Sequence, residues 1–258
     1  MLVWDADPIA FSIGPVVIRY YGLFFALGFI IGYFIMQFLF RKAGYKTEDL
    51  DKLLTFLFIG TIVGARLGHC LIYEPQFYLS HPLEILKIWH GGLASHGGTI
   101  GVLLAIYIFA KRCHYRFLVI ADMLCIPVAL VSTFIRLGNF MNSEILGKYT
   151  DSPLGIVFAR IGDTMPRYPA QLFEAFAYFI IFIILTLAYF YVKKRGPGFI
   201  LGLLFILIFS ARFIIEPFKV EQADYTTGIA LNVGQILSIP FIILGIILII
   251  YSRHKRLN

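Results

Sequence analysis

The sequence predicts an all-α, polytopic membrane protein, and three observations lead to that prediction. Of the 258 residues, 59% are hydrophobic and only 14% are charged. The mean hydropathy is +0.83, whereas soluble domains are about half apolar and a quarter charged. Apolar runs close to the ~20 residues that a helix needs to cross a bilayer recur along the chain. We therefore expect a single integral membrane domain over residues 1–258.

Seven apolar segments are long enough, or nearly so, to span a membrane as helices. Their predicted limits are 16–39, 53–73, 93–110, 117–135, 172–192, 199–215 and 231–251. The third and sixth segments are short and carry His96 and Arg212 at their edges. The first residues contain Asp5 and Asp7 instead of the lysines of a signal peptide, and no small-residue cleavage site follows. We expect seven transmembrane helices and no cleaved leader.

The basic residues are unevenly distributed, and their distribution predicts the orientation of the chain. If the segments alternate in direction, 13 of the 22 Lys and Arg residues fall on one side of the membrane. They are Arg41, Lys42, Lys46, Lys52, Lys111, Arg112, Arg116, Lys193, Lys194, Arg195, Arg253, Lys255 and Arg256. The positive-inside rule then places the C-terminus in the cytoplasm and the N-terminus outside. The net charge of +7 is explained by topology and by attraction to anionic lipid, so nucleic acid is not an expected partner.

Polar residues gather in the loops that this orientation places outside. The long outward-facing loop between helices four and five, residues 136–169, is unusual in an otherwise economical membrane protein, and such loops are usually functional. A smaller outward loop, 217–230, carries Lys219, Glu221 and Asp224. No internal repeat is visible, which disfavours a transporter built from repeated halves. A transporter or channel lined by the same charges nevertheless stays the alternative to an enzyme.

Arg136 and Arg212 are the most informative charges, because each lies at the outward end of an apolar segment. A cation in the hydrocarbon region costs at least ~2.5 kcal/mol, so such residues are usually paired or functional. The planar guanidinium group suits bidentate binding of phosphate. The alternative is that each arginine extends to the interface or pairs with a carboxylate, and Glu216 lies four residues after Arg212 on the same helical face. The polar residues that follow Arg136 are Asn139, Asn142 and Glu144.

The stretch HGGLASHGGTIG, residues 90–101, contains five glycines around His90 and His96. Glycines let helices approach closely and can break a helix where the chain lines a cavity. His96 is therefore either a general base near neutral pH or a histidine that is hydrogen-bonded to a neighbouring helix. The sequence has no histidine pair four residues apart and no HExxH motif, so no metal site is expected. Ser95 lacks the Gly-x-Ser-x-Gly context of a serine hydrolase.

Three further polar side chains lie in or beside apolar segments. Arg66, in GARLGH, and Asp122 are expected to be compensated within the helical bundle, and a structural pairing is the favoured interpretation of Asp122. Tyr21 belongs either to an interfacial aromatic belt or to an inward-facing site. The three cysteines lack CxxC spacing and are interpreted as packing residues. They are Cys70, Cys113 and Cys125.

These motifs resemble those of a known family. The stretch RLGNFMNSEILG, from Arg136 to Gly147, resembles the Arg-x-Gly-Asn-Phe-x-Asn-x-Glu-x-x-Gly signature of bacterial prolipoprotein diacylglyceryl transferases. Five other blocks lie in the order of that family and extend the resemblance over nearly the whole chain. They are IRYYGLFFALGF, GARLGH, HGGLASHGG, YPAQLFE and ARFIIEPFK. The seven-helix topology with an outside N-terminus is also similar to that of the family.

The resemblance implies a reaction, its partners and its location. Such enzymes transfer the diacylglyceryl group of phosphatidylglycerol to the lipobox cysteine thiol of a preprolipoprotein signal peptide, which yields a thioether and glycerol 1-phosphate. The expected location is the bacterial inner membrane, with the site toward the outer leaflet, membrane lipid as partner, and no cofactor or metal. The expected catalytic residues are His96, Arg136 and Arg212. The expected substrate-binding residues are Tyr21, Arg66, Arg136, Asn139, Asn142, Glu144, Gly147 and Glu216.

The chain departs from the family pattern at three positions. Tyr168 replaces a frequent histidine, Phe173 replaces a frequent tyrosine, and Lys219 replaces the usual arginine. The first change removes a histidine from the YPAQLFE block, and the last keeps a cation but loses the guanidinium fork.

The chemistry of the reaction agrees with the residues present. A thiol with a pKa of ~8.5 is a poor nucleophile until it is deprotonated, and either His96 or Glu144 could accept its proton. Charge then develops on phosphate oxygens, where two preorganised guanidinium groups would stabilise it.

Overall fold

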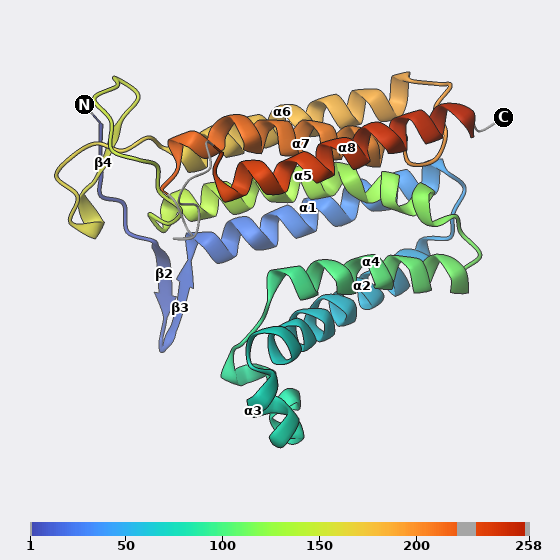
Figure 1. The fold of residues 1–258 in the computed structure, drawn as a ribbon, viewed down its shortest axis with the longest axis horizontal. Coiled ribbons are helices and arrows are strands. Elements are labelled where there is room, and N and C mark those ends of the chain that lie inside the picture. Colours follow the sequence, from blue (N-terminus) through green and yellow to red (C-terminus); the bar gives the residue numbers. More distant parts are fainter. Residues whose placement is uncertain (1, 221–230, 256–258) are drawn as a thin grey trace. The chain divides into compact units, whose positions relative to one another are not determined.

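The structure, a computed structural model, describes residues 2–220 and 231–255, and it is mostly helical (Figure 1). The described chain divides into two compact units. The large unit consists of residues 1–36 and 122–258, and the small unit consists of residues 37–121. The single domain stays a prediction, and each unit is described by itself. The predicted loop residues Glu221 and Asp224, and Arg256 of the basic C-terminus, lie outside the described residues.

Seven helices of 17 residues or more make up most of the described chain. They are α1 (Tyr20–Lys42), α2 (Thr47–Gly68), α4 (Ser95–Arg112), α5 (Phe117–Met141), α6 (Ala170–Tyr191), α7 (Phe199–Ile215) and α8 (Val233–His254). A π-helical turn, His69–Tyr73, follows α2 directly, and the 3₁₀ turn Glu216–Phe218 follows α7. The remaining α-helix in the described ranges, α3 (Pro75–Ser80), has six residues.

Six helices among the described residues are long and apolar enough to cross a membrane. The candidate spans involve α1, α2, α5, α6, α7 and α8. Helix α4 is not among them, because it begins with Ser95, His96 and two glycines and ends with Lys111 and Arg112. The chain is therefore a polytopic membrane protein, and a seventh crossing stays a prediction.

The expectation of an all-α chain was wrong in one respect, since the described residues include four short strands. Strand β1 (Leu2–Trp4) pairs in parallel with β4 (Ile156–Phe158), and β2 (Ile9–Ile13) pairs in antiparallel fashion with β3 (Val16–Arg19). We predicted that the first helix would begin at residue 16, but α1 begins at Tyr20. The β-branched side chains of residues 16–18 favour an extended backbone, and Gly14, with a φ of +58°, lies in the turn of the hairpin.

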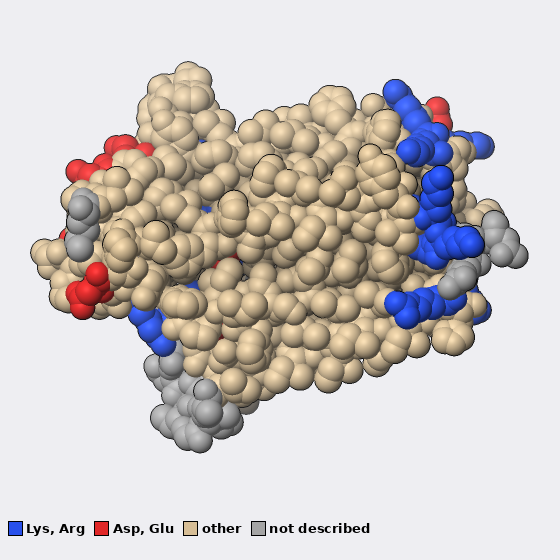
Figure 2. Space-filling view, turned by 90° about the horizontal axis from the view of Figure 1, so that it is seen from above, with Lys and Arg blue, Asp and Glu red and all other residues tan. Residues whose placement is uncertain are grey.

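In the large unit, neighbouring helices run in opposite directions. An added Cβ on Gly28 would lie 3.3 Å from Phe134, and one on Gly32 would lie 3.2 Å from Pro127, so α1 and α5 pack closely in antiparallel fashion. The loop between α6 and α7 lies beside the C-terminal end of α8, because Gly196 packs against the carbonyl groups of Ser252 and Lys255. One end of this unit therefore collects the ends of α6 and α8 with their basic residues. Figure 2 shows Lys and Arg gathered at one end of the visible face and most of the acidic residues at the other.

Asp122 joins two helices at the basic end of the large unit. Its two carboxylate oxygens accept hydrogen bonds of 2.8 Å from the backbone N–H groups of Gly198 and Leu201. These groups belong to the N-terminus of α7, where backbone donors have no partner within the helix. The structural pairing predicted for Asp122 is confirmed, and its hydrogen-bond partners are backbone groups.

The small unit is built on a close contact between α2 and α4. A Cβ added to Gly101 would overlap the carbonyl oxygen of Gly60, and one added to Gly64 would lie 2.8 Å from the Cα of Gly101. Gly97 packs in the same way against Gly64 and Gly68. The glycines therefore let the two backbones approach to a distance that any larger side chain would prevent.

Candidate active site

The RLGNFMNSE stretch folds into a chain of polar contacts at the C-terminal end of α5, in the large unit. Arg136 and Asn139 lie on the same face of the helix, and Arg136 Nη1 donates to Asn139 Oδ1 at 3.3 Å. The carboxylate of Glu144 accepts from both amides, at 3.2 Å from Asn139 Nδ2 and at 3.1 Å from Asn142 Nδ2. The predicted site residues of this motif are therefore in direct contact with one another.

The loop that carries Glu144 has an unusual backbone. The residues on either side of it, Ser143 and Ile145, have φ values of +53° and +55°, which is rare for non-glycine residues and an outlier for a β-branched one. Such strain costs about 1–3 kcal/mol per residue and concentrates at functional sites. The Glu144 N–H donates to the Asn139 carbonyl at 2.9 Å, and the side chain of Gln171 donates to the Glu144 carbonyl. These contacts hold the carboxylate against the two amides.

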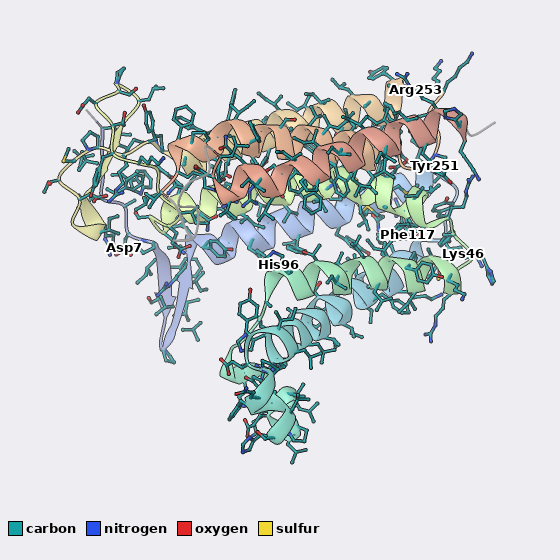
Figure 3. The ribbon with its side chains drawn as sticks, in the orientation of Figure 1. Asp7, Lys46, His96, Phe117, Tyr251 and Arg253 are labelled. Atoms are coloured by element: carbon teal, nitrogen blue, oxygen red, sulfur yellow. The ribbon has the colours of Figure 1, made fainter. Side chains whose placement is uncertain are left out.

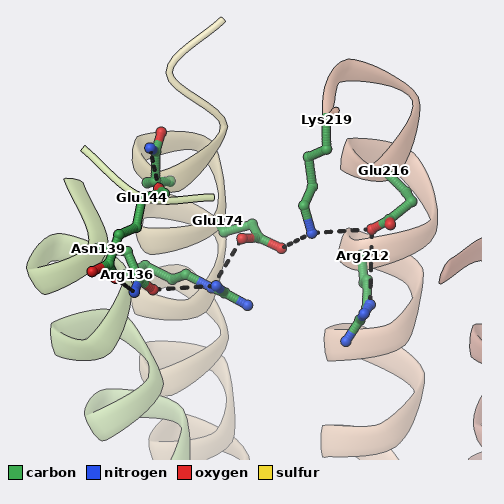
Figure 4. Close-up of polar contacts among 8 residues, drawn as sticks. Arg136, Asn139, Glu144, Glu174, Arg212, Glu216 and Lys219 are labelled. Carbon is green, nitrogen blue, oxygen red and sulfur yellow. Dashed lines mark hydrogen bonds and ion pairs between the residues drawn. The ribbon is translucent and has the colours of Figure 1, made fainter. Parts of the chain in front are cut away.

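A chain of five charged residues crosses the same end of the large unit (Figure 4). Arg136 Nε lies 2.9 Å from Glu174 Oε2, and Lys219 Nζ lies 3.5 Å from Glu174 Oε1. Lys219 Nζ also donates to Glu216 Oε2 at 3.2 Å, and Arg212 Nε lies 3.9 Å from that oxygen. The Arg136–Glu174 contact is an ion pair without hydrogen-bond geometry. We refer to these five residues as the ion chain.

The ion chain is buried in its middle and more open at its ends. The side chains of Glu174 and Lys219 are 1% and 4% exposed, whereas those of Arg136 and Arg212 are 18% and 38% exposed. The predicted pairing of Arg212 with Glu216 is present, but Glu216 is closer to Lys219. The two guanidinium groups therefore have access to a ligand, whereas Glu174 and Lys219 do not, and Glu216 is 15% exposed.

Sequence reasoning missed Glu174 as a site residue and gave Lys219 no partner. Glu174 is the last residue of YPAQLFE and the only charged residue of α6. A carboxylate that lies alone in an apolar helix could have been recognised as needing a buried cation. Lys219 follows Glu216 by three residues, a spacing that allows a contact on one helical turn.

Gly147 acts through close packing in this structure. Its N–H donates to the Tyr168 carbonyl at 3.2 Å, and the next N–H, of Lys148, donates to the Phe218 carbonyl at 2.8 Å. A Cβ at position 147 would overlap the Tyr168 carbonyl oxygen. The backbone of Gly147 also forms a bridge with that of Lys219, so this glycine helps to place the middle of the ion chain.

Two cavities open beside these residues within the large unit. One, of about 320 Å³, is lined by Arg136, Asn139, Tyr21 and Tyr178, together with four other residues. The other, of about 520 Å³, is lined by Tyr21, Asn142, Glu144 and residues 17–19 and 22. Tyr21 faces both cavities, which supports the inward-facing interpretation of its side chain. The geometry can accommodate a ligand that has an anionic group and a polar extension.

The outward loop has its own network of charges. Arg167 donates through Nε to Asp163 Oδ2 at 2.6 Å, and its guanidinium carbon lies 3.8 Å from the centre of the Tyr149 ring. The hydrogen bond from Arg167 lowers the pKa of the Asp163 carboxyl below its usual value, and the hydrogen bond to Asp163 raises the pKa of Tyr149. Arg160 pairs with Asp7 at 2.9 Å. These arginines stabilise the loop and its contact with the N-terminal segment.

Arg66 and His96 belong to the small unit, so the structure does not bring them into one compact unit with Arg136. Arg66 is buried, and its guanidinium group donates to the backbone carbonyls of Glu84, Ile85, Gly91 and Gly92. These bonds tie the end of α2 to the segment that precedes α4. His96 lies exposed in the first turn of α4 (Figure 3), and its side chain forms no hydrogen bond or ion pair within the described ranges.

Comparisons with known proteins agree with the sequence motifs. The family model described as prolipoprotein diacylglyceryl transferase matches residues 8–251. A phosphatidylglycerol–prolipoprotein diacylglyceryl transferase of Tolumonas auensis is 55% identical over 257 residues, which cover 99% of each chain. Proteins of the same name from Chloroherpeton thalassium and Bacteroides fragilis are 46% and 39% identical, and the matches cover 97% and 98% of this chain and 94% and 96% of theirs. The predicted resemblance is confirmed, and the chain belongs to the prolipoprotein diacylglyceryl transferase family.

Proposed function

We propose that this protein transfers the diacylglyceryl group of phosphatidylglycerol to the lipobox cysteine of a prolipoprotein, the first step of lipoprotein maturation. The relatives that share 39–55% identity carry the name of this activity. The observation in the structure that supports it best is the pair of accessible guanidinium groups, on Arg136 and Arg212, at the two ends of a buried ion chain. A transporter or channel is not favoured, because the whole-chain match is to a transferase family.

The reaction breaks one C–O bond and forms one C–S bond. The cysteine thiol loses its proton and attacks the glycerol carbon that bears the phosphate, and the phosphate leaves with the second glycerol as glycerol 1-phosphate. Arg136 and Arg212 bind the phosphate and stabilise the negative charge that grows on its oxygens. Proton balance is restored when the leaving phosphate takes up the proton of the thiol.

The remaining site residues position the substrates in this proposal. Asn139 and Asn142 hold the Glu144 carboxylate beside the larger cavity, where it can accept a proton from the thiol. Tyr21 contacts ligands in either cavity, and Glu216 orients Arg212. His96 is the second candidate for the base. Arg66 acts by holding the segment that leads to His96, in view of its four carbonyl contacts.

We further propose that the chain crosses the bacterial inner membrane seven times, with the N-terminus outside, the C-terminus in the cytoplasm and the site toward the outer leaflet. In the large unit, the basic residues at the ends of α6 and α8 lie at the end opposite to Arg136 and Glu174, as the positive-inside rule requires. Helix α4 supplies the seventh crossing, since it packs along α2 through glycines over two helical turns.

The phosphate assignment is tested with Arg136→Ala in a transfer assay that uses labelled phosphatidylglycerol and a lipobox peptide. Loss of one preorganised donor costs about 3 kcal/mol, so the rate should fall a hundredfold or more. The matched control is Arg160→Ala, because the ion pair of Arg160 in the described part of the chain is with the exposed Asp7, and its loss should leave transfer near that of the unmodified protein. Normal transfer by Arg136→Ala would exclude this residue as the phosphate ligand, and lipid flux in proteoliposomes without a covalent product would support a transporter.

The role of His96 is tested by the pH dependence of transfer. If His96 accepts the thiol proton, His96→Asn should lose activity at neutral pH and recover most of it above the thiol pKa of ~8.5, where the nucleophile ionises without help. A loss that is the same at every pH would assign His96 a structural role and leave Glu144 as the base.

A further inference from the structure

Glu174 and Lys219 are buried charges that take no part in the bond changes of the proposed reaction. Burial of an ionised group is costly unless it is paired, so their presence in the core of the large unit needs a reason. Each is paired on two sides. Glu174 contacts Arg136 and Lys219, and Lys219 contacts Glu174 and Glu216.

The formal charge of the ion chain depends on Lys219. The five residues comprise three cations and two carboxylates, which leaves one excess positive charge. Without Lys219, the two arginines would face two carboxylates and the charge would be zero. The phosphodiester of a glycerolipid carries one negative charge, which the excess charge would balance.

Lys219 cannot deliver this charge by touching the lipid, because its side chain is almost fully enclosed. It acts through the two carboxylates, which it approaches at 3.5 and 3.2 Å. Each carboxylate then divides its attraction between Lys219 and one arginine. Accordingly, the Arg212–Glu216 contact is long, at 3.9 Å, and no described residue accepts a hydrogen bond from the Nη groups of Arg212. Figure 4 shows both guanidinium groups at the ends of the chain, with Glu174, Lys219 and Glu216 between them.

We propose that Lys219 is a positioning residue that supplies the excess charge of the ion chain and so keeps Arg136 and Arg212 available for a singly charged phosphodiester. The proposal rests on the proposed function for the identity of that lipid as phosphatidylglycerol. Lys219 contributes to binding of the anion in the ground state and in the transition state alike. Its removal should therefore change KM and leave kcat nearly unchanged.

The experiment compares four forms of the full-length protein in the transfer assay. Lys219→Met removes the charge at similar volume and should raise KM for phosphatidylglycerol about tenfold, with kcat within about threefold of the unmodified protein. Lys219→Arg keeps the charge and should retain a KM near the original. The double variant Glu174→Gln with Lys219→Met restores one excess positive charge, and its KM should return to within about threefold of the original.

If Lys219 has a purely structural role, the KM values of the variants should follow a different order. The double variant, which loses the charges of both Glu174 and Lys219, should then have a KM at least as high as that of Lys219→Met. A double variant whose KM is as high as that of Lys219→Met would overturn the proposal, as would a Lys219→Met protein that loses kcat and keeps its KM. If Lys219→Met does not fold, the comparison moves to Glu174→Gln, which carries two excess charges. Its KM should be no higher than that of the double variant, and a higher value contradicts the proposal.

A binding measurement separates failure of this inference from failure of the proposed function. In detergent micelles, added phosphatidylglycerol should raise the thermal unfolding midpoint of the unmodified protein and of the double variant by similar amounts, and that of Lys219→Met by clearly less at the same lipid concentration. Uncharged diacylglycerol is the control, and it should change the unfolding midpoints of the three proteins equally. Absence of transfer by the unmodified protein would refute the proposed function, whereas equal midpoint shifts in all three proteins would refute only the role of Lys219.

Discussion

Replacement of Gly147 with alanine perturbs the contact that supports the middle of the ion chain. A Cβ at this position would overlap the Tyr168 carbonyl oxygen and would lie 2.7 Å from the Tyr168 Cβ and 2.9 Å from the Phe218 carbonyl oxygen. Ordinary contacts of a Cβ begin at 3.4 Å. The neighbouring atoms include backbone, which cannot rotate away, so the segments must separate by roughly half an ångström or more.

The size of the effect follows from the bonds that this separation strains. Four backbone hydrogen bonds join the segments. They run from Gly147 to Tyr168, from Lys148 to Phe218, from Tyr168 to Lys148 and from Val220 to Leu146, with lengths of 3.2, 2.8, 3.0 and 3.2 Å. Each contributes about 1 kcal/mol, and overpacking costs about 1–3 kcal/mol. The lower entropy of the unfolded alanine chain offsets about 0.4–1 kcal/mol. We expect a net destabilisation of about 2–4 kcal/mol.

The assay is thermal unfolding of the purified protein in micelles, followed by the transfer assay on the same preparation. The midpoint should fall by about 5–10 °C, and transfer should fall at least tenfold because the backbone bridge to Lys219 is displaced. Gly98→Ala is the matched control for stability, since its Cβ would lie 3.5 Å from that of Ala65, an ordinary contact. A Gly147→Ala protein whose midpoint lies within 2 °C of the original, a difference of less than ~1 kcal/mol, would refute the reasoning.

Three other substitutions test the packing and the charges. Asp122→Asn keeps one acceptor for two N–H groups at 2.8 Å and should cost about 1–2 kcal/mol in thermal unfolding; an unchanged midpoint would contradict its capping role. Gly101→Val should abolish folded protein in size-exclusion chromatography, because even a Cβ overlaps the Gly60 carbonyl; a monodisperse, stable variant would contradict the close contact. Asp163→Asn should destabilise at pH 7, since Arg167 lowers the pKa of Asp163 in the folded protein. This stabilisation is present above the unfolded pKa of ~3.9 and is lost as the pH falls through the lowered folded value. The difference in unfolding midpoint should therefore shrink below about pH 4, and a difference that is independent of pH would refute the ion pair.

The helices were predictable because hydropathy is a property of each segment alone. The sixth segment was predicted at 199–215, and α7 has these same bounds. The fourth was predicted to end at residue 135, but α5 continues to Met141, since hydropathy marks the part of a helix that suits lipid and not the end of its hydrogen bonding. The polar stretch from Arg136 to Glu144 was likewise visible, because its contacts are between residues only a few positions apart.

The sequence by itself therefore determined the membrane class, most of the helices, the family motifs and the local polar chain at the end of α5. Only the tertiary structure decided that Glu174 and Lys219, 45 residues apart, share a buried contact that links Arg136 to Arg212. Periodicity and spacing report which residues share a face of one helix. The partner of a buried charge is chosen by how different helices pack, and that choice leaves no regular interval in the sequence.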